Sequence, residues 1–216
     1  MKTALLVGAT GLVGGYVLEN LLADDFYSKV ILLTRTPLTV KHQKLEEVIV
    51  NFNELEKYAD VIKADTIFCC LGTTIKKAGS QEAFKKVDYE YPLSLAKIAF
   101  QNGASMYLLV SALGSSKNSI VFYNRVKGEV EDAIAQIGYP SFHILQPSLI
   151  IGERKENRLG EGVAQKLSPV FDAMLFGPFS KYKSIKAEQI AKAMVSISKS
   201  DEKGILKHDN TALLKI

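Results

Sequence analysis

Residues 3–15 read TALLVGATGLVGG and are the clearest indication of the fold class. The run TALLV is short and apolar, as is typical of a buried strand, and a helical pattern begins directly after the loop. Gly8, Gly11 and Gly14 stand in that loop. Glycine permits a tight turn, lets backbone N–H groups approach a phosphate, and allows the helix to pack closely on the strand. The stretch therefore predicts a strand–loop–helix unit whose helix N-terminus binds the phosphates of a nucleotide.

The glycine spacing departs by one residue from the dinucleotide-binding pattern G-x-G-x-x-G, because two residues separate Gly8 from Gly11. A glycine pattern alone is weak, since many strand-to-helix turns need glycine without binding a ligand. Here the strand before the loop and the helix after it supply the required context. We therefore predict that the cofactor contacts Gly8, Thr10, Gly11, Leu12, Val13 and Gly14.

Short apolar runs alternate with helical periods along most of the chain. Candidate strands cover residues 3–7, 29–33, 47–51, 65–71, 105–110 and 141–146, and candidate helices lie near 11–22, 53–62, 88–102 and 119–137. Strands that are apolar throughout indicate a sheet covered on both faces, and the alternation indicates right-handed crossovers. We predict an α/β fold, a doubly wound parallel sheet (Rossmann fold) with helices on both faces.

The pattern loosens after Pro147. Helix candidates cover about 161–175 and 186–199, and the short runs GILKH (204–208) and ALLKI (212–216) close the chain. A chain of 216 residues suffices for one compact domain but not for two. We predict a single NAD(P)-binding domain over residues 1–216, in which 147–216 contributes a small lobe on the substrate side.

Composition is that of an ordinary soluble globular protein, with 47% hydrophobic and 23% charged residues. No run approaches the roughly 18 apolar residues of a membrane span, and we expect no signal peptide, because MKT leads directly into the first strand. Adjacent residues of a strand point to opposite faces, so we expect Cys69 and Cys70 to be buried thiols without a mutual disulfide. Reduced thiols favour a cytoplasmic location.

The formal net charge of +4 is mild. The lysine pairs at 76–77 and 85–86 lack interleaved aromatic residues and any recognised nucleic-acid module, so we interpret them as solvated charge. We expect neither nucleic acid nor membrane as partners. The helices near 88–102 and 119–137 either pack a homodimer or face solvent. His42, His143 and His208 share no metal-ligand spacing, so we expect structural roles and no metal site.

The residue after the second predicted strand indicates which cofactor is preferred. NAD-binding chains place Asp or Glu there, about 20 residues beyond the glycines, where it binds the ribose 2′-hydroxyl. This chain has Arg35 at that position, whereas Asp24 and Asp25 precede the strand. A guanidinium suits a 2′-phosphate, with which it forms charge-assisted hydrogen bonds. We predict NADP(H) in preference to NAD(H); the alternative is a surface arginine that stacks on the adenine or has no ligand.

Small and polar residues follow the third and fourth predicted strands. In an open α/β sheet, ligands bind at the carboxyl ends of the strands around the point where the strand order reverses. Gly72 leaves space for the cofactor's phosphate and ribose, and Asn51 and Phe52 can flank its adenine. Each alone is also compatible with an ordinary strand end. Their shared edge favours cofactor contacts from Asn51, Phe52, Leu71, Gly72 and Thr73.

Longer motifs extend from the first residues to about residue 161: VGATGLVGG (7–15), FCCLGTT (68–74), AG (78–79), VD (87–88), YNRVKGEVE (123–131), QPSLIIGER (146–154) and NRLGE (157–161). In these motifs the chain resembles the short-chain dehydrogenase/reductase superfamily, in its atypical or extended branch. The likeness is most specific to the Tat-interacting oxidoreductase-like proteins of the NAD(P)-binding Rossmann group. The resemblance implies a Rossmann sheet, a nicotinamide cofactor and, in active members, a Ser-Tyr-Lys triad.

Carried over to this chain, the resemblance implies that the triad is Ser111, Tyr123 and Lys127. Ser111 follows the fifth predicted strand in the context SALG, and the other two keep the spacing Y-x-x-x-K. The resemblance also implies that Tyr123 and Lys127 contact the cofactor and that Pro147 and Leu149 lie beside its nicotinamide. The alternative is a turn serine, a tyrosine on the helix surface and a solvated lysine.

Tyr123 and Lys127 are four residues apart in a predicted helix, so their side chains share one face. A lysine cation favours the phenolate form of a tyrosine, which can then exchange a proton with a substrate oxygen while Ser111 hydrogen-bonds that oxygen. We predict an NADP(H)-dependent oxidoreductase that interconverts a carbonyl and an alcohol in a small molecule of unknown identity. The alternative is a regulatory or sensor protein that binds NADP(H) without turnover. This alternative stays open because Asp88 stands where active members often carry an asparagine that supports a proton relay.

Overall fold

The computed structural model of the chain describes residues 1–152 and 181–216. Its central element is a seven-stranded sheet in the order β3-β2-β1-β4-β5-β6-β9. All neighbouring strands pair in parallel. The strands are β1 (Lys2–Val7), β2 (Tyr27–Thr34), β3 (Leu45–Ile49), β4 (Thr66–Cys69), β5 (Met106–Val110), β6 (Ser141–Gln146) and β9 (Gly204–Asp209). This is the strand order of a doubly wound Rossmann fold, so the predicted fold class is confirmed.

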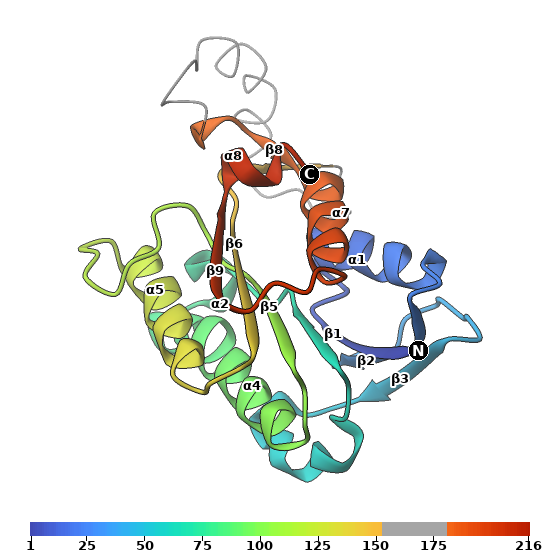
Figure 1. Ribbon diagram of the computed structural model, residues 1–216. Helices are drawn as coiled ribbons and strands as arrows, with labels where there is room; N and C mark the ends of the chain where they lie inside the picture. The colour runs from blue at the N-terminus through green and yellow to red at the C-terminus, as the bar shows by residue number, and fades with distance from the viewer. Residues whose placement is uncertain (153–180) are drawn as a thin grey trace.

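The first strand shows how both faces of the sheet are filled. Side chains alternate along a strand, and Ala4 and Leu6 lie in one hydrophobic cluster whereas Leu5 and Val7 lie in the other. The first cluster is covered by α1 (Leu12–Ala23) and α7 (Ala187–Ile197), and the second by η1 (Phe52–Val61), α4 (Tyr91–Gln101) and α5 (Phe122–Ala135). Figure 1 shows α1 and α7 on one side of the sheet and α4 and α5 on the other. Two covered faces explain strands that are apolar throughout.

The helix predicted near 88–102 begins earlier and less regularly than its pattern indicates. Ser80 caps α3 (Gln81–Lys85) by accepting a hydrogen bond from the N–H of Ala83 at 3.1 Å. The chain then continues through a π-helical turn, η2 (Lys86–Glu90), into α4. A separate short helix, α2 (Ile75–Ala78), precedes α3. Elements this short carry no periodic pattern, and the sequence therefore does not predict α2 and α3.

The C-terminal segment joins the main sheet through β9, which pairs with β6 and leads into α8 (Asn210–Leu213). A second sheet consists of β7 (Ile150–Ile151) and β8 (Ile185–Lys186). The helix predicted over 161–175 lies outside the described residues, so the small lobe over 147–216 stays a prediction. In the part of the chain that the structure describes, no helix is long and apolar enough to cross a membrane.

Candidate functional site

The glycine loop joins β1 to α1 at the carboxyl edge of the sheet. Gly8 has a φ of +88°, and a Cβ at this residue would lie 2.5 Å from the carbonyl oxygen of Cys70. A Cβ at Gly14 would lie 2.2 Å from the carbonyl oxygen of Gly8. Gly11 is the N-cap of α1 and has no side chain to satisfy the first N–H groups of the helix. These N–H groups and the positive end of the helix dipole suit a phosphate.

Three other predicted residues of this loop differ in exposure. Thr10 is exposed, Leu12 is half-buried, and Val13 is buried in the cluster beneath α1. Leu12 lies against Gly152, where an added Cβ would be 3.1 Å from the Leu12 side chain. Gly152, directly after β7, therefore lies beside the start of α1.

Arg35, Asn51 and Phe52 lie together at the carboxyl ends of β2 and β3. Arg35 is exposed directly after β2. Asn51 is exposed and caps η1, since its Oδ1 accepts a hydrogen bond from the N–H of Asn53 at 3.1 Å. Phe52 is buried in the core, and its ring centroid lies 5.5 Å from that of Tyr91. Burial raises the pKa of Tyr91, and the charge of Arg35 opposes that shift. The guanidinium is therefore close enough to Tyr91 to interact with it electrostatically.

The residues after β4 lie against a buried ion pair. A Cβ at Gly72 would lie 3.5 Å from Oδ1 of Asp88 and 3.7 Å from Nζ of Lys127. The N–H of Thr73 donates to Oδ2 of Asp88 at 2.9 Å. Oδ1 of Asp88 lies 2.8 Å from Nζ of Lys127. Leu71, which completes the predicted set here, is half-buried. Because Gly72 has no side chain, it does not cover the ammonium group of Lys127.

Lys127 and Tyr123 share one face of α5. Lys127 is only 4% exposed, whereas Tyr123 is partly exposed and its ring packs against Phe84 with centroids 5.6 Å apart. Burial lowers the pKa of Lys127, but Asp88 and then Tyr123 raise it, and the net shift is upward. The lysine is therefore charged at neutral pH, close enough to the tyrosine for the two groups to interact electrostatically.

Ser111 follows β5, and its N–H donates to the carbonyl oxygen of Leu145 at 2.8 Å. The Ser111 hydroxyl donates to Oε1 of Glu131 at 2.5 Å. Glu131 also accepts a hydrogen bond from Gln146 at 2.9 Å and pairs with Lys207 at 2.9 Å. Sequence reasoning missed this buried carboxylate. A signal was present, since Tyr123, Lys127 and Glu131 recur at intervals of four residues and therefore lie on one helix face.

The loop of residues 112–121 is held against α5 by a close backbone approach. A Cβ at Gly128 would lie 2.2 Å from the carbonyl carbon of Ser116 and 2.3 Å from the backbone nitrogen of Lys117. The N–H of Ser116 donates to the carbonyl oxygen of Asn124 at 3.1 Å. Gly128, in the middle of the motif YNRVKGEVE, is therefore what lets the serine-rich loop lie along the helix.

The segment after β6 is tied to both Ser111's loop and the C-terminus. The carbonyl oxygen of Pro147 accepts a hydrogen bond from the N–H of Leu113 at 2.8 Å. The N–H of Ser148 donates to Oδ1 of Asn210 at 3.1 Å. Leu149 is 42% exposed, and its carbonyl oxygen accepts from the N–H of Ile185 at 3.0 Å. Pro147 and Leu149 thus lie at the same carboxyl edge of the sheet as Ser111.

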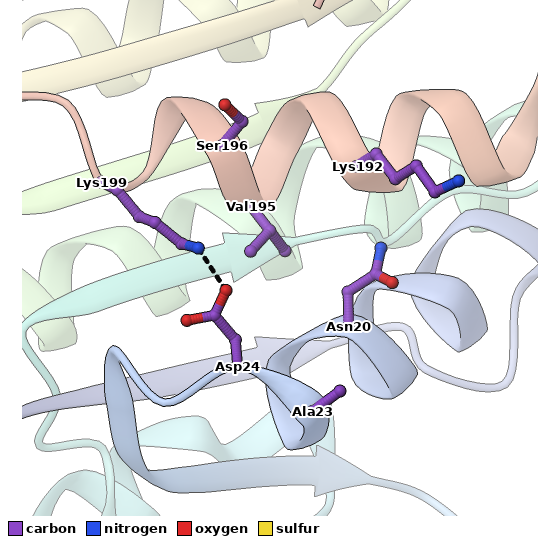
Figure 2. A pocket seen from close by; sticks show the side chains of 7 residues that line it. All are labelled: Asn20, Ala23, Asp24, Lys192, Val195, Ser196 and Lys199. Atoms are coloured by element: carbon purple, nitrogen blue, oxygen red, sulfur yellow. Dashed lines mark hydrogen bonds and ion pairs between the residues drawn. The ribbon is translucent and has the colours of Figure 1, made fainter.

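Two clefts lie outside this cluster. One, of about 320 Å³, adjoins the predicted adenine edge and is lined by Phe52, Asn53, Glu56, Lys86, Glu90, Tyr91 and Ser94. The other, of about 300 Å³, lies between the last turns of α1 and α7. Figure 2 shows Asp24 and Lys199 meeting across it. Because it is at the opposite end of α1 from Gly11, this second cleft is not part of the glycine-loop site.

Three histidines were predicted to have structural roles. His143 is completely buried between Ser141, whose Oγ lies 2.8 Å from His143 Nε2, and His208, whose Nε2 lies 3.0 Å from His143 Nδ1. Nδ1 of His42 accepts a hydrogen bond from the N–H of Lys44 at 3.2 Å. Within residues 1–152 and 181–216, no group of three or more His, Cys, Asp or Glu side chains is arranged to hold a metal ion.

A family model described as "NAD dependent epimerase/dehydratase family" matches residues 4–119. This range contains the glycine loop, Arg35, Gly72 and Ser111. The chain belongs to the NAD-dependent epimerase/dehydratase family. It is accordingly an NAD(P)-binding Rossmann protein of this family.

Curated relatives extend the epimerase/dehydratase match beyond residue 119. The rat protein HTATIP2 is 35% identical over 169 residues, which cover 76% of this chain and 69% of the relative. Protein FMP52, mitochondrial, of Candida albicans is 34% identical over 171 residues, covering 76% of this chain and 75% of the relative. The predicted resemblance to the atypical short-chain dehydrogenase/reductase branch is confirmed.

Several solved structures share the fold of this chain. MoeE5 in complex with UDP-glucose and NAD superposes with a TM-score of 0.73 at 14% identity, covering 95% of this chain and 74% of that one. The UDP-N-acetylglucosamine 4-epimerase of Methanobrevibacter ruminantium, in complex with UDP-N-acetylmuramic acid, gives 0.73 at 16% identity, covering 96% and 76%. At such low identities the likeness concerns the fold alone.

The names of the curated relatives show that the expected cytoplasmic location is wrong. Fungal relatives from Candida albicans, Debaryomyces hansenii and Emericella nidulans are named as mitochondrial proteins. Cys69 and Cys70 are free thiols, as expected, although only Cys69 is buried and Cys70 is half-buried. The inference of location failed because reduced thiols report only the redox state of a compartment.

Proposed function

We propose that this chain is an NADP(H)-dependent oxidoreductase of the short-chain dehydrogenase type, which interconverts a carbonyl and an alcohol. The observation that carries the proposal is the placement of Lys127. Its ammonium is buried, held by Asp88 at 2.8 Å, and shares one face of α5 with Tyr123. An uncompensated cation would be costly to bury, so a fixed charge at this point next to a tyrosine supports a proton-transfer role for that tyrosine.

Each residue of the site has a separate role in the proposed reaction. Hydride transfer is the chemistry that a bound nicotinamide supplies. Tyr123 donates its phenolic proton to the carbonyl oxygen, and Lys127 stabilises the phenolate that remains. Ser111 orients the substrate oxygen from the end of β5. Gly8, Gly11 and Gly14 leave the backbone of the loop open to the pyrophosphate, and Gly72 leaves room for a ribose beside Lys127.

Arg35 supports the choice of NADP(H). It is exposed at the end of β2, the position where NAD-binding chains carry a carboxylate, and it influences Tyr91 electrostatically. A 2′-phosphate at this edge would receive charge-assisted hydrogen bonds from the guanidinium.

Oxidation of NADPH by a panel of aldehydes, ketones and quinones tests the proposal. We expect at least one substrate to be reduced, and we expect Tyr123→Phe to lower kcat by about a hundredfold or more, as for loss of a general acid. NADPH affinity should change little, because the phenyl ring keeps its packing on Phe84. Tight NADPH binding with no Tyr123-dependent oxidation across the panel would refute the enzyme assignment.

A cofactor-binding regulatory protein without turnover is the second candidate. One observation favours it: the Ser111 hydroxyl already donates to Glu131 at 2.5 Å, so its proton is engaged when no substrate is bound. Under this alternative, NADP(H) would bind with the same dependence on Arg35 and the glycines, and Tyr123→Phe would change no measured rate. The substrate panel therefore separates the two candidates.

A further inference from the structure

A series of hydrogen-bonded polar side chains connects Ser111 to the surface. Ser111 donates to Oε1 of Glu131 at 2.5 Å, and Oε2 of Glu131 lies 2.9 Å from Nζ of Lys207. Ser111 is 4% exposed and Glu131 1%, whereas the Lys207 side chain is 51% exposed. Side chains from the end of β5, from α5 and from β9 thus connect the triad serine to solvent.

Glu131 is the carboxylate in this series of hydrogen-bonded side chains. Gln146 donates to both of its oxygens, at 2.9 and 3.1 Å, and so fixes the plane of the carboxylate. A serine hydroxyl has one proton and two lone pairs. Ser111 gives that proton to Glu131 and keeps two lone pairs for other partners, one of which is Ser115, whose Oγ lies 3.1 Å away. The carboxylate is therefore placed to move protons through Ser111.

A second series of polar contacts, which begins at Lys127, stays inside the protein. Lys127 pairs with Asp88, whose side chain is completely buried. The other oxygen of Asp88 accepts a hydrogen bond from the backbone N–H of Thr73 at 2.9 Å. A backbone amide does not pass a proton onward. Within the described ranges, these contacts of Asp88 lead to no exposed side chain, in contrast to those of Glu131.

Resting on the proposed function, we propose that Glu131 and Lys207 carry protons between Ser111 and solvent during turnover. In carbonyl reduction, Tyr123 gives its proton to the substrate oxygen, and the phenolate recovers a proton from Ser111 through the product hydroxyl that both contact. In the same concerted step Lys207 gives a proton to the Glu131 carboxylate, Glu131 passes one to Ser111, and water then reprotonates Lys207 and leaves as hydroxide. One proton is taken from water for each hydride transferred, and alcohol oxidation runs the same steps in reverse.

Glu131→Gln tests this route, because glutamine keeps the size of the side chain and can accept the Ser111 hydrogen bond but has no carboxyl proton to exchange. We expect kcat for NADPH-dependent reduction to fall about tenfold or more. The KM for substrate and the affinity for NADPH should stay within about twofold, and the solvent deuterium isotope effect on kcat should increase as proton delivery becomes rate-limiting. Lys207→Met should give a smaller loss of the same kind.

Asp132→Asn is the matched control. Asp132 is the next residue on α5, but its side chain is 41% exposed and pairs at 2.7 Å with Lys117, which is not a triad residue. It removes the same charge from the same helix, so kcat and the isotope effect should remain at the wild-type values.

Chemical rescue separates proton transfer from mere support of the fold. In Glu131→Ala, added formate should restore kcat in proportion to its concentration, because a small carboxylic acid replaces the lost group. A wild-type kcat and isotope effect in Glu131→Gln, or a loss that formate leaves untouched, would overturn the proton route while leaving the proposed function intact. Absence of turnover in the wild-type protein would instead overturn the proposed function, and the route with it.

Discussion

Nζ of Lys127 lies 2.8 Å from Oδ1 of Asp88, and the two side chains are 5% and 0% exposed. The pair joins η2 to α5 directly beneath Gly72, at the point where the predicted ribose would lie. A buried cation without a partner is strongly unfavourable, so the aspartate makes the position of this lysine possible. The departure from asparagine at residue 88 therefore has a structural consequence, because the aspartate charge compensates the charge of the buried lysine.

Removal of the Asp88 carboxylate should destabilise the fold severely. We expect Asp88→Ala to lower the free energy of unfolding by about 3–5 kcal/mol, since the charge of Lys127 would remain buried without a partner. Urea denaturation measures the change. The double variant Asp88→Leu/Lys127→Met should recover most of the loss, whereas Asp132→Ala, which breaks an exposed pair, should cost about 1 kcal/mol or less. Equal effects of the two single variants would contradict the prediction.

Gly14→Ala should damage the cofactor loop more than Gly15→Ala. The new Cβ at residue 14 would lie 2.2 Å from the carbonyl oxygen of Gly8, which must move. We expect a loss of about 1–3 kcal/mol in stability and weaker NADP(H) binding. At residue 15 the nearest atom would be 3.5 Å away, and helix propensity favours alanine by up to about 1 kcal/mol. Thermal unfolding and fluorescence titration with NADPH compare the two, and a Gly14→Ala protein that binds NADPH normally would refute this account.

Arg35→Asp should reverse the cofactor preference. Loss of charge-assisted hydrogen bonds to a 2′-phosphate is worth about 1.5–3 kcal/mol, or about ten- to a hundredfold in the dissociation constant of NADPH. NADH binding should be unchanged or tighter, because a carboxylate suits the 2′-hydroxyl. Lys41→Asp supplies the same change of charge at another exposed residue after β2 and should leave the ratio of affinities unchanged. An unchanged ratio in Arg35→Asp would show that this arginine does not read the 2′-phosphate.

Acid should destabilise the protein through the His143–His208 pair. Ser141 Oγ donates to the carbonyl oxygen of Glu202 at 2.7 Å, so it accepts from Nε2 of His143, and Nδ1 of His143 then accepts from His208. This arrangement requires a neutral His143 ring, because its Nδ1 must accept a hydrogen bond. Burial, and then the neighbouring His208, lowers the pKa of His143 from 6.5 to about 4.

The unfolded chain therefore binds a proton at His143 at a higher pH than the folded chain does. The stabilising contribution is complete above about pH 6.5 and is lost as the pH falls towards 4. Urea unfolding at pH 7.5, 6 and 5 should show a decline that is smaller in His143→Gln, whose amide keeps a donor for Ser141. A decline of the same size in both proteins would show that the histidine is not its cause.

Most of the fold and part of the site could be predicted from local patterns. The six predicted strands appear as β1 to β6, with β6 spanning the expected residues 141–146, because strands buried on both faces stand out as apolar runs. The glycine loop and the Y-x-x-x-K spacing could also be predicted, because each depends on residues near one another in the sequence. All the predicted cofactor contacts, those of the glycine loop included, and the catalytic roles of Ser111, Tyr123 and Lys127 stay predictions.

By itself, the sequence determined the α/β class, the glycine turn and the helix face shared by Tyr123 and Lys127, because turns and helical spacing are local properties of the chain. Only the tertiary structure decided which buried charges meet. It joins Ser111 to Glu131 across 20 residues and Glu131 to Lys207 across 76. Such pairs depend on which strands become neighbours, and β9 lies beside β6 although the two strands are far apart in the sequence. A charge loses its water only when the tertiary structure buries it, so no local sequence pattern reveals which charges are buried together.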